Sequence, residues 1–591
     1  MLTNEQQAFA SLPLEGFVAA CPGAGKTLAI VARVKRIWNA LPPRQGVAVL
    51  SFTNSAVDTF TKRCREDGLE AVLRLSNFVG TFDGFVRHFL VLPFGIALCA
   101  KRPIVVDSWR SLGVEVRLRG ALTFRLGVPL DHFDAATNTI DPARIGDLGL
   151  RAHVARYRAQ YEVAAAARRA ALHQFGYLSA EDARVEAHRC IQDDRKATAL
   201  GRALHARFGE VIVDEAQDCN PVDLAILAWL RGHGVPVTVV CDPDQAIYGF
   251  RHGEPTALQQ FGVPYPAAQR PSLTGNFRSS RPITQLAATL RSRVEPDNPL
   301  GETANLTHPV IVATYDGAKV PAAIGSFFVQ CLENPAVGIS KKDGIILAHQ
   351  STDARRAAGD SLGEELSGQS RIEAIARAVG EFWCDSANSR LRRAAVRTAE
   401  RLLLELLGHW HENDHHPNRV IERENLNARQ LRRDALALLM HLPKSCADTD
   451  EARVSWVAAV KAETASLQLS LPAGTSIARF FGGKPKSSWT RHLTLPGNTS
   501  LLCSTIHEAK GREHEAVCVV LRPDRAPDYR TSRLLDAWEH RQELEAKRVI
   551  YVGVTRARRF VMLALPTAFG DQCVRILRHS GVPIERVAIV P

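Results

Sequence analysis

A short glycine-rich turn near the start of the chain carries the residue types that bind phosphate groups. The apolar stretch Phe17–Ala20 predicts a strand, which the sequence CPGAGKT separates from an apolar, helix-like segment at 28–38. Glycines let backbone N–H groups converge on an anion, a lysine adds a compact positive charge, and a threonine hydroxyl can bind Mg²⁺. Ala20 replaces the glycine that usually opens this pattern. The residues predicted to hold a nucleoside triphosphate are Gly23, Ala24, Gly25, Lys26 and Thr27.

Two carboxylates follow a second apolar run, EVIV, further along the chain. The run predicts a strand that leads directly into Asp214 and Glu215. Parallel sheets bind ligands at the C-terminal edge of their strands, which is where these side chains would lie. Asp214 suits Mg²⁺, through water, and Glu215 suits a water molecule that it orients and deprotonates. A carboxylate pair after a strand is common in surface turns, but together with the glycine-rich turn it predicts nucleoside triphosphate hydrolysis.

Buried strands and helices must position these residues. Short apolar runs predict strands, and helical patterns separate them, which favours parallel α/β sheets. The runs lie at 47–52, 211–213, 235–241, 310–314, 344–347, 516–521 and 560–565. They fall into two clusters with two helix-rich intervals between them, at about 88–205 and 361–495. The pattern predicts two α/β cores, each carrying one helical insertion.

Length and composition exclude several classes of protein. The 591 residues allow about four domains or subdomains, and 46% hydrophobic with 23% charged residues is a globular, not a disordered, composition. No apolar run reaches the ~20 residues of a membrane span, and the first residues lack the features of a secretion signal. Twelve scattered cysteines without a CxxC pair fit a reducing compartment, so we expect a cytoplasmic protein. The net charge of +12 fits an anionic partner or a plain solvated surface.

A series of segments follows in one order along the chain: LTNEQQAFA, VLSFTNSAVDTF, VGTFDGFVRHF, VIVDEAQD, VTVVCDPDQAIYGFR, LTGNFRSS, STIHEAKGREHEAVCVV and KRVIYVGVTRARR. In this order they resemble the UvrD/Rep (PcrA-like) family of superfamily 1 DNA helicases. The resemblance implies two RecA-like P-loop cores with ATP in the cleft between them, each core with a mainly helical inserted subdomain. The implied domains are a first core at 1–87 and 206–271 with its insertion at 88–205, and a second core at 272–360 and 496–591 with a shortened insertion at 361–495.

The resemblance also implies which residues contact ATP. Gln6 would read the adenine, Phe277 would stack on it, and Glu513 would contact the ribose. Arg556, which follows the apolar, strand-like run VIYVGV, would be an arginine finger that stabilises charge on the transferred phosphoryl group. The catalytic residues that the resemblance implies are Lys26, Glu215, Gln245, Arg278 and Arg556, with Thr27 and Asp214 for the metal.

A track for single-stranded DNA would lie across both cores. Aromatic side chains on such a track stack on bases, each worth about 1–3 kcal/mol, and tolerate exchange of one ring for another. Asp83 stands where the family usually has histidine, and an acid is unfavourable beside phosphates, so we leave it out of the track. The residues expected to contact DNA are Phe52, Thr53, Asn54, Thr81, Phe82, Tyr248, Phe250, Arg251, Thr505 and His507.

The resemblance implies an ATP-dependent single-stranded DNA translocase and helicase, which moves 3′ to 5′ in the family. The interval from Arg278 to Thr505 is shorter than usual, so translocation is a safer prediction than strong unwinding. Single-stranded DNA and duplex junctions are the expected partners. The alternative is an ATP- and DNA-dependent switch that controls a partner effector, such as a nuclease in bacterial antiviral defence, or a repair protein. Because only a short tail follows Arg556, we expect no nuclease domain in this chain.

Two weaker patterns lie in the second helix-rich interval. The histidines of GHWHENDHH could bind zinc, although an exposed loop between helices is the more usual setting of such a tract. The basic stretch at 390–401 could lie on duplex phosphates or form a solvated helix face.

Overall fold

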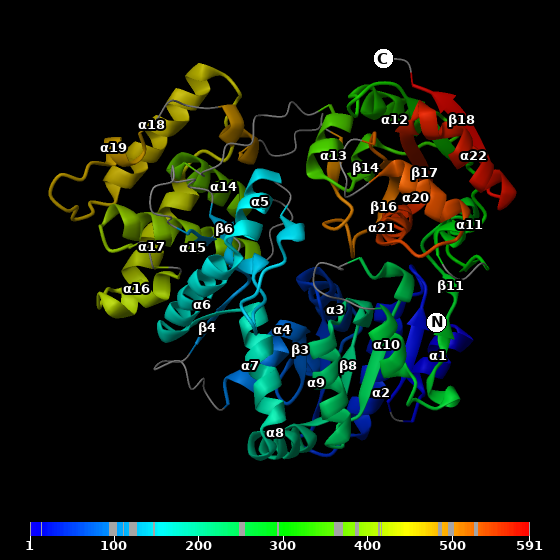
Figure 1. Cartoon of the computed structure of the whole chain (residues 1–591), viewed down its shortest axis with the longest axis horizontal. Coiled ribbons are helices and arrows are strands. Elements are labelled where there is room, and N and C mark those ends of the chain that lie inside the picture. The colour runs from blue at the N-terminus through cyan, green and yellow to red at the C-terminus, as the bar shows by residue number, and fades with distance from the viewer. Residues whose placement is uncertain are drawn as a thin grey trace. The chain divides into compact units, whose positions relative to one another are not determined.

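The chain divides into two structural units (Figure 1). One unit comprises Met1–Ala354 with Cys503–Pro591, and the other comprises Arg355–Leu502, so the finer domain limits stay a prediction. Tyr248, Phe250 and Arg251 of the expected DNA track lie outside the described residues. The computed structural model describes residues 2–589 except 14, 94–102, 110–111, 117–126, 146–147, 248–254, 292–294, 360–369, 384–388, 412–413, 415, 483–486, 494–500 and 525–529.

The first sheet of the larger unit has six strands in the order β10-β1-β9-β8-β2-β3, and every neighbouring pair is parallel. Its strands are β1 (Phe17–Ala20), β2 (Gly46–Ser51), β3 (Phe78–Thr81), β8 (Phe208–Val213), β9 (Val237–Cys241) and β10 (Ser272–Leu273). The helices beside it are α1 (Asn4–Ala10), α2 (Lys26–Ala40), α3 (Asn54–Glu66), α9 (Pro221–Gly232) and α10 (Pro255–Gly262).

Strand β8 shows why the predicted runs are almost continuously apolar. Side chains alternate between the two faces of a strand, and both faces of this sheet are covered. Val211 and Val213 pack in one hydrophobic cluster with Leu227 of α9. Ile212 packs in another cluster with Ile30 of α2. A strand buried on both faces therefore shows no polar alternation.

The second sheet of the same unit also has six strands, in the order β15-β14-β16-β17-β13-β18. They are β13 (Val310–Tyr315), β14 (Gly344–Ala348), β15 (Leu502–Thr505), β16 (His514–Val520), β17 (Ala557–Pro566) and β18 (Ile584–Ala588). The accompanying helices are α11 (Arg281–Leu290), α12 (Ala323–Glu333), α13 (Ser351–Ala357), α20 (Thr531–Glu539), α21 (Glu545–Val554) and α22 (Gly570–His579). Each of the apolar runs from 47–52 to 560–565 that were predicted as strands overlaps a strand of one of the two sheets, which confirms the predicted α/β class.

The run VIYVGV before Arg556 is a helix, so the strand-like reading of that run is wrong. It forms the C-terminal part of α21, and every residue from 549 to 554 is buried. A short apolar run that is buried on all sides carries no periodicity that distinguishes a helix from a buried strand.

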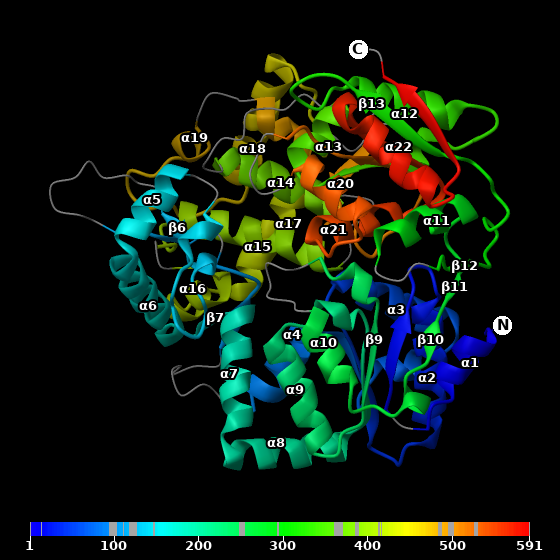
Figure 2. The same ribbon diagram turned by 45° about the vertical axis from the view of Figure 1, so that its right-hand side comes forward.

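The interval after the third strand contains both a small separate core and helices that belong to the first sheet. Its elements are α4 (Phe82–Phe85), β4 (Ile104–Val106), β5 (Gly113–Val114), β6 (Val128–Pro129), α5 (Leu148–Arg156), α6 (Arg158–Gln174), β7 (Tyr177–Ser179), α7 (Ala180–Gln192) and α8 (Asp194–Arg207). Helices α7 and α8 share a hydrophobic cluster with the first sheet. Figure 2 shows α7 beside α9, which packs on that sheet. Asp182 of α7 ties the small core to them, because it accepts a hydrogen bond of 2.7 Å from Trp109 Nε1 and pairs with Arg169.

The regular elements described in the smaller unit are helices, apart from Leu502, which begins β15. They are α14 (Arg371–Trp383), α15 (Ser389–Leu406), α16 (Pro417–Arg423), α17 (Ala428–His441), α18 (Asp450–Ser466) and α19 (Ile477–Phe480), packed around one hydrophobic cluster. In the histidine tract, His409 lies 3.6 Å from Glu424, and His416 accepts a hydrogen bond of 3.2 Å from the Asn418 N–H at the start of α16. His415 lies outside the described residues. The described residues contain no cluster of three or more side chains that could hold a metal ion. None of the described helices is long and apolar enough to span a membrane.

Candidate nucleotide site and DNA track

The glycine-rich turn has the backbone that its sequence predicts. Gly23 and Gly25 have φ values of 74° and 70°, which other residues rarely adopt. A Cβ atom on Gly23 would lie 2.7 Å from Arg278 Cβ, and one on Gly25 would lie 2.7 Å from Gln6 Nε2. Helix α2 begins at Lys26 directly after the turn, so its unpaired N–H groups and its positive dipole end lie at the turn. Backbone conformation thus favours glycine at both positions, and at Gly23 the neighbouring Arg278 also leaves no space for a side chain.

The two predicted carboxylates follow β8 at the edge of the sheet next to this turn. Lys26 Nζ lies 2.9 Å from Glu215 Oε1. The Glu215 N–H donates a hydrogen bond of 2.9 Å to Asp214 Oδ1. Glu215 has a φ of 58°, and a non-glycine residue in the left-handed region stores strain that is typical of functional sites. The structure therefore brings Lys26, Asp214 and Glu215 together.

Burial and charge act differently on the two neighbouring carboxyl groups. Burial, helped by the negative charge of Glu215, raises the pKa of Asp214 above its usual value. Burial would also raise the pKa of Glu215, but the positive charges of Lys26 and Lys510 lower it. An Mg²⁺ ion fits the Asp214 side of this pair, because a hard cation prefers oxygen ligands and would relieve the crowding of negative charge. The Thr27 hydroxyl, next to Lys26, can supply a further oxygen.

Arginines from the second core reach the same site. Arg556 is only 3% exposed, and its Nη2 donates a hydrogen bond of 3.0 Å to Gln245 Oε1. Gln245 Nε2 in turn donates to Asp242 Oδ2 at 2.8 Å. Arg278 donates through Nε to Glu513 Oε2 at 2.8 Å and through Nη1 to a backbone carbonyl at 3.0 Å. Burial and the nearby Arg278 lower the pKa of Arg556. The predicted catalytic residues of the two cores thus meet.

The residues predicted to contact the adenine base and the ribose lie around the glycine-rich turn. They differ in how deeply they are buried and in which groups they bind. Gln6 is 2% exposed, donates to the Ala24 carbonyl at 2.9 Å, and accepts from the Thr3 N–H at 3.0 Å. These two hydrogen bonds leave one amide N–H and one oxygen lone pair of Gln6 for further hydrogen bonds. Phe277 is half-exposed, and its backbone N–H donates to Gly23 at 2.9 Å. Glu513 is paired with Arg278 in this structure, and that pairing lowers the pKa of Glu513 against the effect of burial.

A buried ion pair between the cores escaped the sequence prediction. Lys510 Nζ lies 2.6 Å and 2.7 Å from the two carboxylate oxygens of Asp218 and 3.2 Å from the Gln245 carbonyl oxygen. Ile247 is fully buried within the hydrophobic cluster of the second core. The segment 242–247 of the first core is therefore bound to the second core by charge and by apolar contact. The only signal in the sequence is that Asp218 and Lys510 are charged residues within the segments VIVDEAQD and STIHEAKGREHEAVCVV.

Removing Lys510 should destabilise the contact between the cores. We expect Lys510→Met to reduce stability by about 3–5 kcal/mol, because Asp218 would stay buried without its cation. The double variant Lys510→Met/Asp218→Asn should regain much of the loss, since it buries no uncompensated charge. Thermal denaturation of the wild type and the two variants checks this. Equal losses in the single and double variants would contradict the ion-pair explanation.

The predicted DNA residues of the first core lie where β2 and β3 end side by side. Thr53 caps α3 by accepting a hydrogen bond of 3.2 Å from the Ala56 N–H, and Asn54 is the first residue of that helix. Thr81 caps α4 in the same way, accepting from the Gly84 N–H at 3.1 Å. These threonine hydroxyls therefore hold two helix starts, whose remaining N–H groups can face an anion.

Phe52 and Phe82 form one aromatic pair at this edge. Their ring centroids are 5.4 Å apart with an angle of 11° between the planes. Phe82 is 1% exposed, whereas Phe52 is partly exposed. Phe82 thus lies behind Phe52, and only Phe52 offers a ring face outward. Asp83, which the sequence left out of the track, lies 2.6 Å from Arg184, so its charge is compensated within the protein.

The predicted DNA residues of the second core lie at the end of β15: Thr505 is its last residue, and His507 follows two residues later. Thr505 Oγ1 accepts a hydrogen bond of 3.2 Å from the Glu508 N–H. His507 Nε2 lies 3.3 Å from the Ile247 carbonyl oxygen, and its ring lies 5.6 Å from that of His349. Burial lowers the pKa of His507, and burial together with His507 lowers that of His349 to about 4. Both rings are thus favoured in the neutral state.

Comparison with known proteins agrees with this geometry. Two family models match the chain: the UvrD/REP helicase N-terminal domain at 1–94 and 136–266, and the UvrD-like helicase C-terminal domain at 491–566. The ATP-dependent DNA helicase UvrD2 of Mycobacterium tuberculosis (strain ATCC 25618 / H37Rv) is 26% identical over 597 residues, which cover 96% of this chain and 78% of that protein.

Other relatives match over shorter stretches. DNA helicase II of Escherichia coli (strain K12) is 27% identical over 312 residues, which cover 49% of this chain and 40% of that protein. The Bacillus subtilis (strain 168) relative YjcD is 29% identical over 155 residues, covering 25% of this chain and 20% of its own length. The two family models and the relative that aligns along nearly the whole chain lead to one conclusion: the chain belongs to the UvrD/Rep family of DNA helicases.

Proposed function

We propose that this chain is an ATP-dependent single-stranded DNA translocase and DNA helicase that hydrolyses ATP, with Mg²⁺, between its two cores. The observation that carries the proposal is the contact of Gln245 with Arg556, next to the pair of Lys26 and Glu215. Simple nucleotide binding needs one core, whereas phosphoryl transfer is accelerated by cations on both sides of the phosphate. We place the protein in the cytoplasm, where ATP and DNA are available.

Lys26 and Glu215 would change partners during the reaction. Lys26 lies 2.9 Å from Glu215, and an ammonium group is also a natural partner for a phosphate. Once Lys26 turns to a phosphate, Glu215 loses a charge that lowers its pKa and becomes a better acceptor for the proton of a water molecule. Bound Mg²⁺, held by Thr27 and through water by Asp214, would neutralise part of the phosphate charge.

Gln245 would couple the ATP site to DNA. It binds Arg556 through its side chain, while its carbonyl oxygen accepts from Lys510. The next residues, Ala246 and Ile247, contact the second core through Arg548 and through the hydrophobic cluster. A shift of the second core would therefore move the chain that leads directly to the segment 248–251, where the sequence predicts DNA contacts. This arrangement supports stepping along a strand as the cores open and close.

A strand-displacement assay tests the proposal. The purified chain is mixed with ATP, Mg²⁺ and duplexes that carry a 3′ tail, a 5′ tail or no tail. We expect ATP-dependent displacement on the 3′-tailed duplex and little on the others, as the 3′ to 5′ direction of the family implies. DNA-stimulated ATP hydrolysis with no displacement on any duplex would instead favour the alternative, a switch that controls a partner such as a nuclease. No DNA stimulation of ATP hydrolysis would contradict both.

Two phenylalanines should separate DNA binding from ATP binding. Phe52→Ala should weaken single-stranded DNA binding by about 1–3 kcal/mol, which is the loss of one stacked base, and leave the KM for ATP unchanged. Phe277→Ala should raise the KM for ATP and leave DNA binding unchanged, because Phe277 lies at the glycine-rich turn. Fluorescence anisotropy with labelled oligothymidine and steady-state ATPase assays measure the two effects. If both variants lose both properties equally, the separate assignment is wrong.

A further inference from the structure

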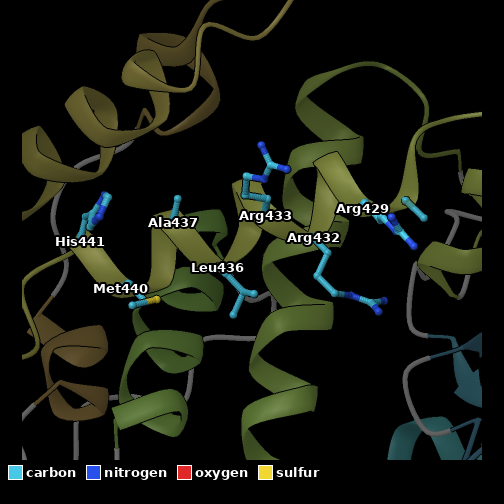
Figure 3. Close-up of a pocket in the computed structure, with 8 residues that line it drawn as sticks. Arg429, Arg432, Arg433, Leu436, Ala437, Met440 and His441 are labelled. Atoms are coloured by element: carbon cyan, nitrogen blue, oxygen red, sulfur yellow. The ribbon is translucent and has the colours of Figure 1, made fainter.

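Helix α17 of the smaller unit carries an exposed stripe that the ATP and DNA sites do not use. One face of α17 is buried in the hydrophobic cluster through Leu431, Leu438 and Leu439. A second face lines a groove of about 520 Å³, and the described residues that line it all come from α17. We call these residues the α17 stripe: Arg429, Arg432, Arg433, Leu436, Ala437, Met440 and His441. Figure 3 shows them along the helix.

The α17 stripe has a basic end and an apolar end. The three arginines lie in its N-terminal half, whereas Leu436, Ala437 and Met440 follow in its C-terminal half (Figure 3). Met440 is 53% exposed, which is unusual for a large apolar side chain. Apolar side chains that gather in an exposed groove with a polar rim mark interaction sites. At 1.5 Å per residue, the 14 residues of α17 extend the stripe over ~20 Å, or several turns of a partner helix.

A second groove enlarges the basic end. It has a volume of about 460 Å³ and shares Arg432 and Leu436 with the first groove. Helix α15 adds Arg392, Arg393 and Arg397 to its lining. The one acidic residue among the described lining residues is Glu400, which is fully buried and already accepts a hydrogen bond of 2.9 Å from Arg432. The two grooves together thus present a strong excess of positive charge.

We propose that the α17 stripe docks an amphipathic helix of a partner protein, with acidic side chains at one end and large apolar side chains at the other. The arginines would face the acidic end, and Leu436 and Met440 would receive the apolar end. Spacings of three and four residues, as between Arg429, Arg433, Leu436 and Met440, fit the ridges of a helix laid along α17. The proposal is independent of ATP hydrolysis.

Protein fits this surface better than duplex DNA. Interfaces with DNA are polar and strongly basic, so phosphates would match the arginines but leave the apolar end of the stripe in water. Arginine and methionine are both enriched in the cores of protein interfaces. The combination of the two types on one face of one helix therefore favours a protein partner, and duplex DNA becomes an outcome of the test.

Binding of designed peptides to the full chain tests the proposal. Three labelled 18-residue peptides are compared by fluorescence anisotropy: one with an acidic half followed by a leucine-rich helical half, one with the same composition in scrambled order, and polyglutamate. We expect the first peptide to bind at least about 10-fold more tightly than the other two, since it alone matches both ends. Its affinity should fall as salt rises, because the arginines contribute.

Variants then locate the site. Arg429→Glu/Arg433→Glu and, separately, Met440→Glu should each weaken binding of the first peptide by about 10-fold or more. Arg432 is left in place because it holds the buried Glu400. The matched control is Arg401→Glu/Arg479→Glu, with the same change of charge at exposed residues outside the two grooves, and it should bind normally. Unchanged melting temperatures exclude unfolding, and Glu215→Gln should leave peptide binding intact.

Two results would overturn the proposal. Equal affinity for the three peptides, or full binding by both stripe variants, would show that the stripe does not recognise an amphipathic helix. Failure of the peptides combined with tight binding of a 20-base-pair duplex that is lost only in Arg429→Glu/Arg433→Glu would make the stripe a DNA contact. A loss of strand displacement alone would bear on the proposed helicase function and not on this surface.

Discussion

Replacing Arg556 with alanine should lower the turnover of DNA-stimulated ATP hydrolysis by about 10³-fold or more. A guanidinium group supplied from the opposite core stabilises charge on the transferred phosphoryl group, and removal of such a finger has effects of 10³–10⁵. Arg556 is suited to that role because it is buried and is held next to Gln245 by a hydrogen bond of 3.0 Å. Its fixed position means that little rearrangement is needed before it can act.

Controls must separate this chemistry from stability, since Arg556 is buried. Arg556→Lys keeps the charge but loses the planar fork, so it should recover only a small part of the rate. Arg559→Ala removes a nearby guanidinium that donates to the Val337 carbonyl at 3.0 Å, and it should keep turnover within about 10-fold of the wild type. Steady-state rates at saturating ATP and single-stranded DNA measure all three. Turnover of Arg556→Ala within 10-fold of the wild type would argue against the finger.

Replacing Glu215 with glutamine should lower ATP turnover by about 10²–10⁴-fold, which is the usual contribution of a general base. ATP binding should be kept or improved, because the variant no longer holds Lys26 in an ion pair of 2.9 Å. The prediction therefore couples a large loss of rate to an unchanged or lower Kd for ATP. Single-turnover hydrolysis and equilibrium binding of a fluorescent ATP analogue measure the two quantities.

A surface carboxylate provides the comparison for Glu215. Glu181 is 52% exposed and pairs with Arg184, which Asp83 and Asp223 also hold, so Glu181→Gln should leave both rate and affinity near the wild type. A weaker affinity for ATP in Glu215→Gln would indicate that Glu215 organises the site for binding. In that case its role as the base would lose support.

Local chemistry explains why much of the nucleotide site could be predicted from sequence. Gly23, Gly25 and Lys26 lie within four residues. The two glycines indicate a backbone conformation that other residues rarely adopt, and the lysine indicates a positive charge. Asp214 and Glu215 follow an apolar run whose strand character depends on burial from both faces. In each case the information lies within a few residues.

The parts that were missed depend on partners far away in sequence or on burial alone. Lys510 and Asp218 are 292 residues apart, and neither local sequence indicates that the two side chains form an ion pair. The run VIYVGV resembles a strand in sequence because burial on all sides removes the periodicity that would identify helix α21. The capping of α3 and α4 by the hydroxyls of Thr53 and Thr81 was also not predicted, and their contact with DNA stays a prediction.

The position of Ile247 has a mechanical consequence. Its side chain is enclosed by the second core, while Cys241, six residues earlier, is fixed in the first sheet. Six residues span at most ~20 Å, so the cores cannot move far apart while Ile247 stays in place. Withdrawing a buried isoleucine into water requires about 1.5–3 kcal/mol. Separation of the cores should therefore require this free energy at the outset, so we expect the cores to part in one discrete step and not by gradual loosening.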